Sequence, residues 1–86
     1  MKVENMVSSN GNKVPNQFWI TDNNADYFQS YKSMIAKRED GIVTLDCNYW
    51  DYSVTTSKYR NKFLGMTSKE IKQGIKDGSI LLDNLN

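Results

Sequence analysis

The sequence predicts an α+β fold in which a small antiparallel β-sheet, of three to five strands, carries two short C-terminal helices packed on one face. Segments rich in aromatic and β-branched residues fill the first half of the chain, which is typical of strands. The pairs Asn10-Gly11 and Asp40-Gly41 are typical of hairpin turns between such strands. The last third instead holds helix caps followed by glycines. Because 86 residues suffice for one small core, we expect a single domain over residues 1–86.

The composition narrows the function classes and the compartment. The chain has no histidine, which is the usual general base and the commonest metal ligand. Its one cysteine, Cys47, excludes an internal disulfide, and we expect a small buried thiol there, the alternative being a reactive one. No apolar run approaches the roughly 20 residues that span a bilayer, and residues 1–11 do not resemble a signal peptide. We therefore expect a cytoplasmic protein with no membrane partner.

The first hairpin is expected around Asn10-Gly11, after a short lead-in at residues 1–6. A two-residue loop of type I′ needs positive φ at both positions, and it sets Val7 opposite Val14. Pro15 has no N–H to donate to a ladder. This hairpin is therefore expected to be short or to lie at a sheet edge.

Two further strands are expected before residue 38. Gln17–Thr21 places Phe18 and Ile20 on one face and Trp19 on the other. After turn residues at 22–24, one strand is expected from Tyr27 to about Lys37, with partial cover on both faces. One face of that strand is expected to carry Phe28, Ser30, Met34 and Ala36, and the other Tyr27, Tyr31, Ser33 and Ile35.

Asp40-Gly41 predicts a second hairpin, whose return strand covers Ile42–Cys47. A two-residue loop there brings apolar side chains together across the ladder, which supports the register. The expected cross-strand pairs are Arg38 with Val43, Ala36 with Leu45, and Met34 with Cys47.

The first helix is predicted from its buried stripe and its ends. Tyr59 and Phe63 are spaced by four residues and form one apolar face, with Leu64 beside it. Gly65 follows as the left-handed residue that ends the helix. Three hydroxyl residues are candidate N-caps: Ser53, Thr55 and Thr56.

The second helix is predicted by a capping box, in which Thr67 and Glu70 satisfy each other's backbone N–H groups. Met66 and Ile71 form the matching hydrophobic staple, Ile71 and Ile75 the buried stripe, and Gly78 the end. Gly74 inside the helix indicates close packing against the sheet. Residues 79–85 are expected to be a final short strand or a packed tail.

Catalytic chemistry has little support in the sequence, so we expect no enzyme, no cofactor and no metal. There is no glycine-rich phosphate loop, no CxxC, no HExxH and no nucleophile elbow. Asp46 and Asp51 flank the aromatic stretch, but a solvated strand end and a turn or cap residue explain them better. A domain of this size also has little room for a closed reaction cavity.

Binding is the better-supported class. The chain has more aromatic rings than its core can enclose, and Trp and Tyr are the usual anchors of an interface. The alternative is that these rings only half-bury over the core. We take four of them as candidate partner contacts: Trp19, Tyr31, Trp50 and Tyr52.

A basic stretch provides a second candidate surface. Residues 58–76 hold six basic side chains and one acid, whereas the whole chain has a net charge of only +1. Five of these residues form the predicted basic face: Lys58, Arg60, Lys62, Lys69 and Lys72. Interleaved aromatic and basic residues suit single-stranded nucleic acid, although on a helix Tyr59 and Phe63 point away from Arg60 and Lys62. Solvated surface lysines are the plainer interpretation.

Three segments, VSSNGNKVPNQFWI, DYFQSYKSMIA and WDYSVTTSKYRNKFLG, precede a short KEIKQGIKDG helix. Together they resemble a family of small uncharacterised proteins carried by phages and prophages of low-GC Gram-positive bacteria. The resemblance covers nearly the whole chain, and the aromatic and hydroxyl-rich stretch is its most specific part. That family has no assigned activity, so the resemblance implies a phage setting and transfers no functional residue.

The main hypothesis is therefore a small phage-encoded binding protein that modulates or inhibits a host or defence macromolecule, as an anti-CRISPR protein does. Its partner is expected to be a host or defence-system protein or ribonucleoprotein. The alternative is a nucleic-acid-binding protein that uses the basic face of residues 58–76. A structural phage component, which would form a regular oligomer, is a third class.

Overall fold

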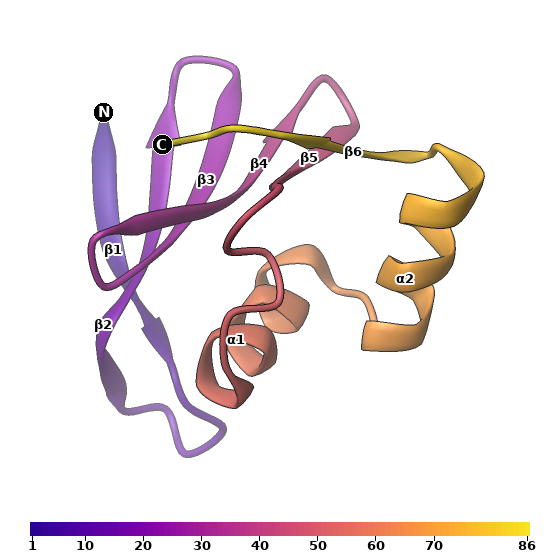
Figure 1. Cartoon of the computed structure of the whole chain (residues 1–86). Coiled ribbons are helices and arrows are strands. Elements are labelled where there is room, and N and C mark those ends of the chain that lie inside the picture. Colours follow the sequence, from indigo (N-terminus) through magenta and orange to yellow (C-terminus); the bar gives the residue numbers. More distant parts are fainter.

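The computed structural model describes all 86 residues and contains six strands and two helices. Figure 1 shows both helices on the same side of one twisted sheet. The strands lie side by side in chain order: β1 (Lys2–Val7), β2 (Lys13–Asp22), β3 (Ala25–Ser30), β4 (Ser33–Glu39), β5 (Ile42–Asp46) and β6 (Ile80–Asp83). The helices α1 (Val54–Leu64) and α2 (Ser68–Asp77) connect β5 to β6. The α+β class and the C-terminal helices are confirmed, whereas the predicted strand count is too low.

The sheet is mixed and not purely antiparallel. Strands β1 to β5 form an antiparallel meander, but β6 runs parallel to β5, with Val43 beside Ile80 and Leu45 beside Leu82. Parallel neighbours need a long crossover connection, which here is the helix pair. Of the two alternatives expected for residues 79–85, the final short strand is therefore the one that forms.

The first hairpin differs from its prediction. Residues 1–6 belong largely to β1, and Val7 pairs with Lys13 instead of Val14. The loop is longer than two residues, because the Ser8 N–H donates to Asn12 O at 2.8 Å and Gly11 alone of the Asn-Gly pair has positive φ. A three-residue loop that ends in a left-handed glycine is a common hairpin connection. The hairpin does lie at the sheet edge, as Pro15 predicted.

The single strand expected over residues 27–37 is in fact the β3–β4 hairpin. Tyr31 turns the chain with φ 55°, and its N–H donates to Asn16 O at 2.7 Å. A bulge in β4 then places Ala36 opposite Phe28 and Met34 opposite Gln29. The face prediction for this segment was therefore wrong, since Met34 lies on the opposite face from Phe28 and Ala36.

The β4–β5 hairpin follows its prediction closely. Asp40 and Gly41 have φ values of 53° and 78°, and Arg38 pairs with Val43 while Ala36 pairs with Leu45. The expected pair of Met34 with Cys47 does not form, because Met34 pairs with Gln29 of β3 and because β5 ends at Asp46. Cys47 is exposed, which corrects the expectation of a buried thiol.

Both helices end at the predicted glycines, α2 begins at the predicted cap, and α1 begins at one of its three candidate caps. Ser53 is the N-cap of α1, with its Oγ accepting the Thr56 N–H at 3.1 Å, and Gly65 ends it with φ 66°. Thr67 and Glu70 form the capping box of α2, and Gly78 ends it. Gly74 lies against β6, since a Cβ at that position is only 2.6 Å from Ile80 Cδ1. The close packing expected at this glycine is confirmed.

The core lies between the sheet and the helices. Phe28, Leu45, Phe63 and Ile71 are completely or almost completely buried there. Trp19 extends this layer, with its ring centroid 4.7 Å from that of Phe63 in an edge-to-face arrangement. Because both helices pack on this side, the opposite face of the sheet carries no helix (Figure 1).

Candidate functional site

The uncovered face of the sheet carries a cluster of apolar side chains over β1 to β4. Val3 pairs with Ile20, and Ile20 pairs with Tyr27, so these three side chains form one row across three strands. A second row beside it joins Phe18, Gln29 and Met34. Exposed faces of antiparallel sheets usually carry polar residues. The apolar rows therefore mark this face as a candidate binding surface.

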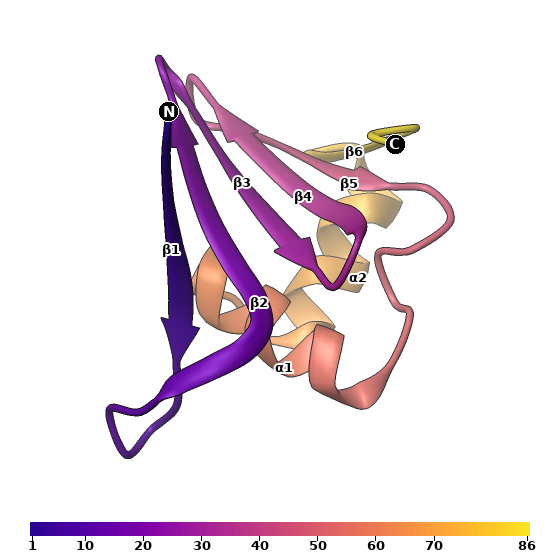
Figure 2. The ribbon, with the colours of Figure 1, turned by 90° about the vertical axis from the view of Figure 1, so that its left-hand side faces the viewer.

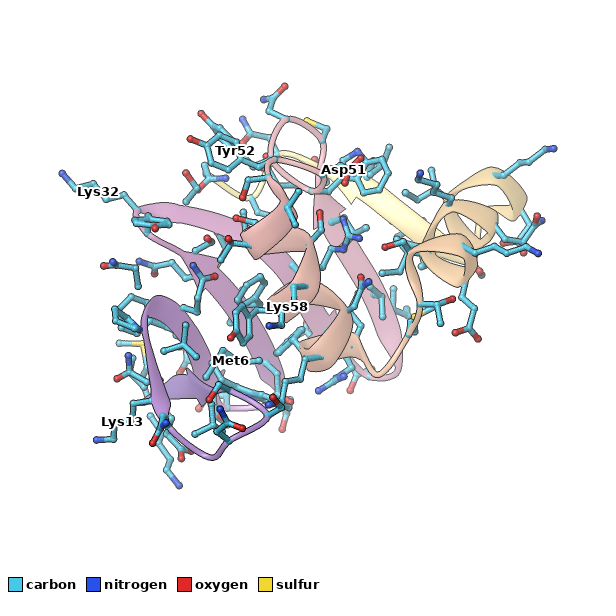
Figure 3. All side chains as sticks on the ribbon, turned by 90° about the horizontal axis from the view of Figure 1, so that it is seen from below. Met6, Lys13, Lys32, Asp51, Tyr52 and Lys58 are labelled. Atoms are coloured by element: carbon cyan, nitrogen blue, oxygen red, sulfur yellow. The ribbon has the colours of Figure 1, made fainter.

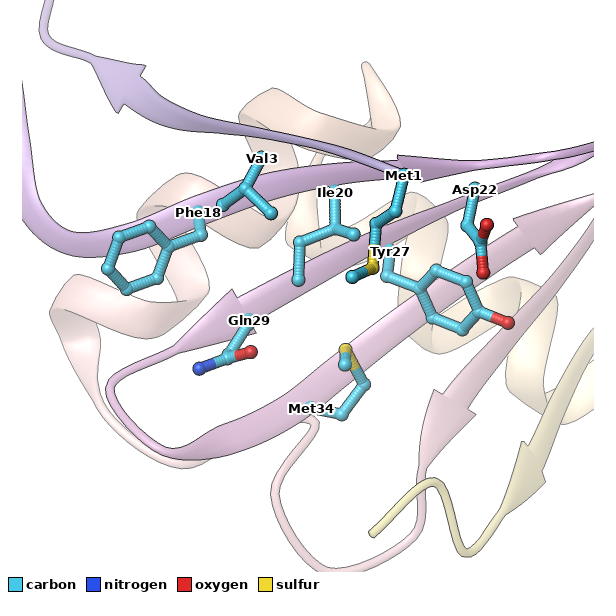
Figure 4. Close-up of a pocket in the computed structure, with 8 residues that line it drawn as sticks. All are labelled: Met1, Val3, Phe18, Ile20, Asp22, Tyr27, Gln29 and Met34. Atoms are coloured by element: carbon cyan, nitrogen blue, oxygen red, sulfur yellow. The ribbon is translucent and has the colours of Figure 1, made fainter.

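These rows surround an open hollow of about 520 Å³. Figure 4 shows its side chains gathered on one face of the sheet, with the helices behind the strands. The hollow is lined by Met1, Val3, Phe18, Ile20, Asp22, Tyr27, Gln29 and Met34. We call this set the sheet-face hollow.

The sheet-face hollow is accessible to a partner. Met1 and Val3 are 89% and 55% exposed, and Phe18, Tyr27 and Met34 are half-buried. Only Ile20 is buried at its floor. Covering apolar surface of this kind with a second apolar surface lowers the free energy, because both surfaces leave water.

The hollow has one carboxylate in its lining and an ion pair beside it. Asp22 forms no salt bridge with any residue of the chain. Lys37, the cross-strand neighbour of Tyr27, is 3.1 Å from Glu39, whose hydrogen bond and charge raise the pKa of the lysine. The carboxylate of Asp22 is therefore a charge without an ion pair that a partner meets in this hollow.

The four predicted aromatic contacts lie in different environments. Trp19 is half-buried in the helix layer, below the Arg38 guanidinium at 5.6 Å, and Trp50 lies below that of Arg60 at 5.5 Å. Tyr31 and Tyr52 are exposed. The structure therefore uses the two tryptophans in internal packing and leaves the two tyrosines available to a partner.

The basic face loses one predicted member. Arg60 is only 1% exposed, and its guanidinium donates to Trp50 O, to the Asn61 side chain and to Ser68 Oγ. Burial lowers the pKa of Arg60, while Asp51 at 3.5 Å partly offsets this effect. Arg60 therefore ties the loop before α1 to the start of α2, and it is not part of an exposed basic surface.

The predicted lysines are exposed and form no ion pair. Lys62 reaches back to β1, where its Nζ donates to Val7 O. Lys69, Lys72 and Lys76 follow one another along α2 around a shallow depression. Figure 3 shows Lys58 on α1, with Asp51 and Tyr52 on the loop that precedes it. We call the exposed residues Lys58, Lys62, Lys69, Lys72 and Lys76 the helix lysines.

The carboxylates that flank the aromatic stretch do not form a pair with each other. Asp46 is fully buried and accepts backbone N–H groups from Asn48, Tyr49 and Leu85. Asp51 instead accepts from Ser57 and Arg60. No group of three or more Cys, Asp or Glu side chains gathers in a way that suits a metal ion. Both carboxylates therefore have structural partners, but Asp46 is buried, which corrects the expectation of a solvated strand end.

Sequence reasoning did not identify the sheet-face hollow. Its main residues, among them Phe18, Ile20 and Tyr27, were assigned to strands but not to a site. The available indication was that both faces of these strands are apolar. A strand pattern of this type predicts cover on both sides, and it does not say which side a partner covers.

Comparison with known families gives one match. Residues 1–78 match the model of a family described as a family of unknown function (DUF8033). The chain belongs to this family. The matched segment ends just before β6 and contains the whole sheet-face hollow.

Searches among curated proteins and solved structures returned no match. No helix of the chain is both long enough and apolar enough to cross a membrane.

Proposed function

We propose that this protein is a non-catalytic binding protein and that it holds a partner protein in the sheet-face hollow. The observation that carries the proposal is the apolar face that the helices leave uncovered. Contiguous exposed apolar surface with a polar rim is typical of interaction sites. The complementary partner surface is an apolar segment with a basic residue placed to reach Asp22.

The expected strength follows from the exposed side chains. Full burial of a Val, Met or Phe side chain is worth about 1.5–3 kcal/mol, and most side chains here are already half-buried. Each one therefore contributes on the order of 1 kcal/mol when it is covered. Several together provide the apolar centre of an interface, from which the entropy cost of association is subtracted.

We further propose that the protein is phage-encoded and that its binding modulates or inhibits a host or defence macromolecule, such as a CRISPR nuclease. This part rests on the resemblance of three sequence segments to small proteins of phages and prophages. The exposed rings of Tyr31 and Tyr52 supply additional contacts at such an interface. The setting proposed for this activity is the cytoplasm of the host cell.

Nucleic-acid binding by the helix lysines is the second candidate function. The observation in its favour is that these five side chains are exposed and none has a carboxylate partner. Lysines free of ion pairs are available to phosphates, and their contribution is strongly salt-dependent. The overall charge of +1 makes this candidate the weaker one.

One experiment separates the two candidates. Partners are captured from host lysate, identified, purified and titrated with wild-type protein, with Met34→Glu and with the double variant Lys69→Glu/Lys72→Glu. Met34 lines the hollow and is half-buried, so a carboxylate there is tolerated by the fold and opposes an apolar partner. The activity of the captured macromolecule is assayed with the same three proteins.

We expect Met34→Glu to weaken partner binding about tenfold or more, with a matching loss of inhibition, and the lysine variant to bind like wild type. Equal partner binding by wild type and Met34→Glu would refute the proposal for the hollow. The second candidate would be established instead if the wild type retards nucleic acid in gels and the lysine variant binds it with a weaker dependence on salt. The expected reduction in that salt dependence corresponds to about two phosphate contacts.

A further inference from the structure

Strand β1 is an open edge of the sheet. It pairs with β2 on one side, and no strand follows it on the other. Figure 2 shows β1 as the outermost strand of the sheet, with both helices behind the sheet in this view. The backbone N–H and C=O groups along the free side of such a strand form a template for another strand.

The side chains of β1 make this edge self-complementary in one register. Lys2 and Glu4 lie on the same face, with Nζ and Oε1 3.3 Å apart, and they are 71% and 61% exposed. Val3 lies between them on the opposite face, where it lines the edge of the sheet-face hollow. Two copies of β1 that pair antiparallel around Val3 place Lys2 of each copy opposite Glu4 of the other. A register centred on Glu4 would instead oppose two carboxylates, which is destabilising.

We propose that β1 pairs with β1 of a second copy of this chain, in the antiparallel register centred on Val3. Cross-strand neighbours lie on the same face, so the two Val3 side chains meet beside the two hollows. The dimer has one continuous sheet, with both helix layers on one side and both hollows next to each other on the other side. This inference goes beyond the proposed function and does not depend on it.

The contact is small, since each copy contributes one strand. Interfaces well below about 1,200 Å² are usually weak, so we expect a micromolar or weaker dimer that exchanges with the monomer. Such a dimer presents two neighbouring hollows to a partner and raises the strength of binding to a partner with two sites.

Charge reversal tests the register. The proteins are Lys2→Glu, Glu4→Lys, the double variant Lys2→Glu/Glu4→Lys, and Lys76→Glu as a control on α2 with the same change of charge as Lys2→Glu. The three side chains substituted in these variants, Lys2, Glu4 and Lys76, are exposed, so folding is preserved and is checked by circular dichroism. Self-association is measured by sedimentation velocity from micromolar to millimolar concentration, without an N-terminal tag.

Each single reversal on β1 opposes like charges at two symmetry-related positions. We therefore expect Lys2→Glu and Glu4→Lys each to raise the dimer dissociation constant about tenfold or more. An equimolar mixture of these two variants restores dimers, because the acidic pair of one faces the basic pair of the other. The double variant dimerises like wild type, and so does Lys76→Glu.

A wild-type protein that stays monomeric at millimolar concentration would overturn the inference. So would dimers that neither single variant on β1 weakens, or that the mixture and the double variant fail to restore. Met34→Glu lies away from β1 and leaves the dimer intact, so loss of partner binding and loss of the dimer are separable results.

Discussion

Replacing Asp46 by asparagine tests how the C-terminal tail is held to the sheet. Asp46 is fully buried at the end of β5. Its Oδ2 accepts the N–H groups of Asn48 at 3.0 Å and Tyr49 at 2.9 Å, and its Oδ1 accepts that of Leu85 at 2.8 Å. Burial raises the pKa of this carboxyl, but hydrogen bonds from Leu85, Asn86, Asn48 and Tyr49 outweigh burial and hold the pKa below its usual value.

The magnitude follows from this geometry. An asparagine keeps one oxygen, which can face Asn48 and Tyr49, while its NH₂ group then faces the N–H of Leu85 donor to donor. One charge-assisted hydrogen bond, worth about 1.5–3 kcal/mol, is lost, and the other two become weaker neutral ones. We expect Asp46→Asn to lower the free energy of unfolding by about 2–4 kcal/mol at pH 7.

The pH dependence has a definite sign. The pKa of Asp46 is lower in the folded state than in the unfolded chain, where it is about 3.9. Its contribution is therefore fully present above about pH 4 and is lost as the pH falls through the folded pKa. The difference in stability between wild type and Asp46→Asn is expected to narrow in the same range.

Urea unfolding followed by circular dichroism, at neutral and acidic pH, measures both effects. Hydrogen exchange at the Leu85 amide reports the release of the tail. Asp83→Asn is the matched control, because Asp83 is exposed on β6 and its change is expected to stay within about 0.5 kcal/mol. An Asp46→Asn protein as stable as wild type at pH 7, or a difference that persists unchanged in acid, would refute this reasoning.

Three further substitutions are measured by the same urea unfolding. We expect Gly74→Ala to destabilise by about 1 kcal/mol, because the new Cβ lies 2.6 Å from Ile80 Cδ1 and 2.8 Å from Cγ1, and this overpacking exceeds the gain in helix propensity. We expect Gln17→Leu to stabilise by about 1–2 kcal/mol, because both polar atoms of the buried Gln17 amide lack a hydrogen-bond partner. We expect Tyr31→Gly to stabilise by about 0.5–1 kcal/mol, because Tyr31 is exposed and its φ of 55° is costly for a residue with a Cβ.

Each of these predictions has its own contradicting result. The double variant Gly74→Ala/Ile80→Val lacks Ile80 Cδ1 and is expected to recover part of the stability that Gly74→Ala loses. Purely additive effects of the two substitutions on the free energy of unfolding would contradict the packing argument. A Gln17→Leu protein less stable than wild type would show that the side-chain amide of Gln17 has hydrogen-bond partners in solution. A Tyr31→Gly protein less stable than wild type would show that contacts of the ring outweigh the backbone strain.

Features that depend on near neighbours in the chain were predictable. The Asp40-Gly41 turn, the Ser53 cap and the Thr67–Glu70 capping box each join groups within about four residues. Such contacts form with little loop-closure cost and in almost any tertiary context. The register of β4 and β5 followed from the turn for the same reason.

Features held by distant contacts were not predictable. Tyr31 is no usual turn residue, and its conformation depends on a hydrogen bond to Asn16 across the hairpins. Arg60 was placed on the wet side of α1 by helical periodicity, but Trp50 O and Ser68 Oγ enclose its guanidinium from either side in the chain. A periodic pattern describes one helix and does not include the segments that fold over it.

The sequence by itself determined the α+β class, both helices with the capping box of α2 and the glycines that end them, and the second hairpin, because these depend on short-range hydrogen bonds and side-chain spacing. Only the tertiary structure decided which face of the sheet the helices cover. Strands β2 and β3 are apolar on both faces, and the packing of α1 on Trp19 and Phe28 selects one of them. The chain has only two helices, and both pack on the other face of the sheet. The face that they leave open therefore carries the sheet-face hollow.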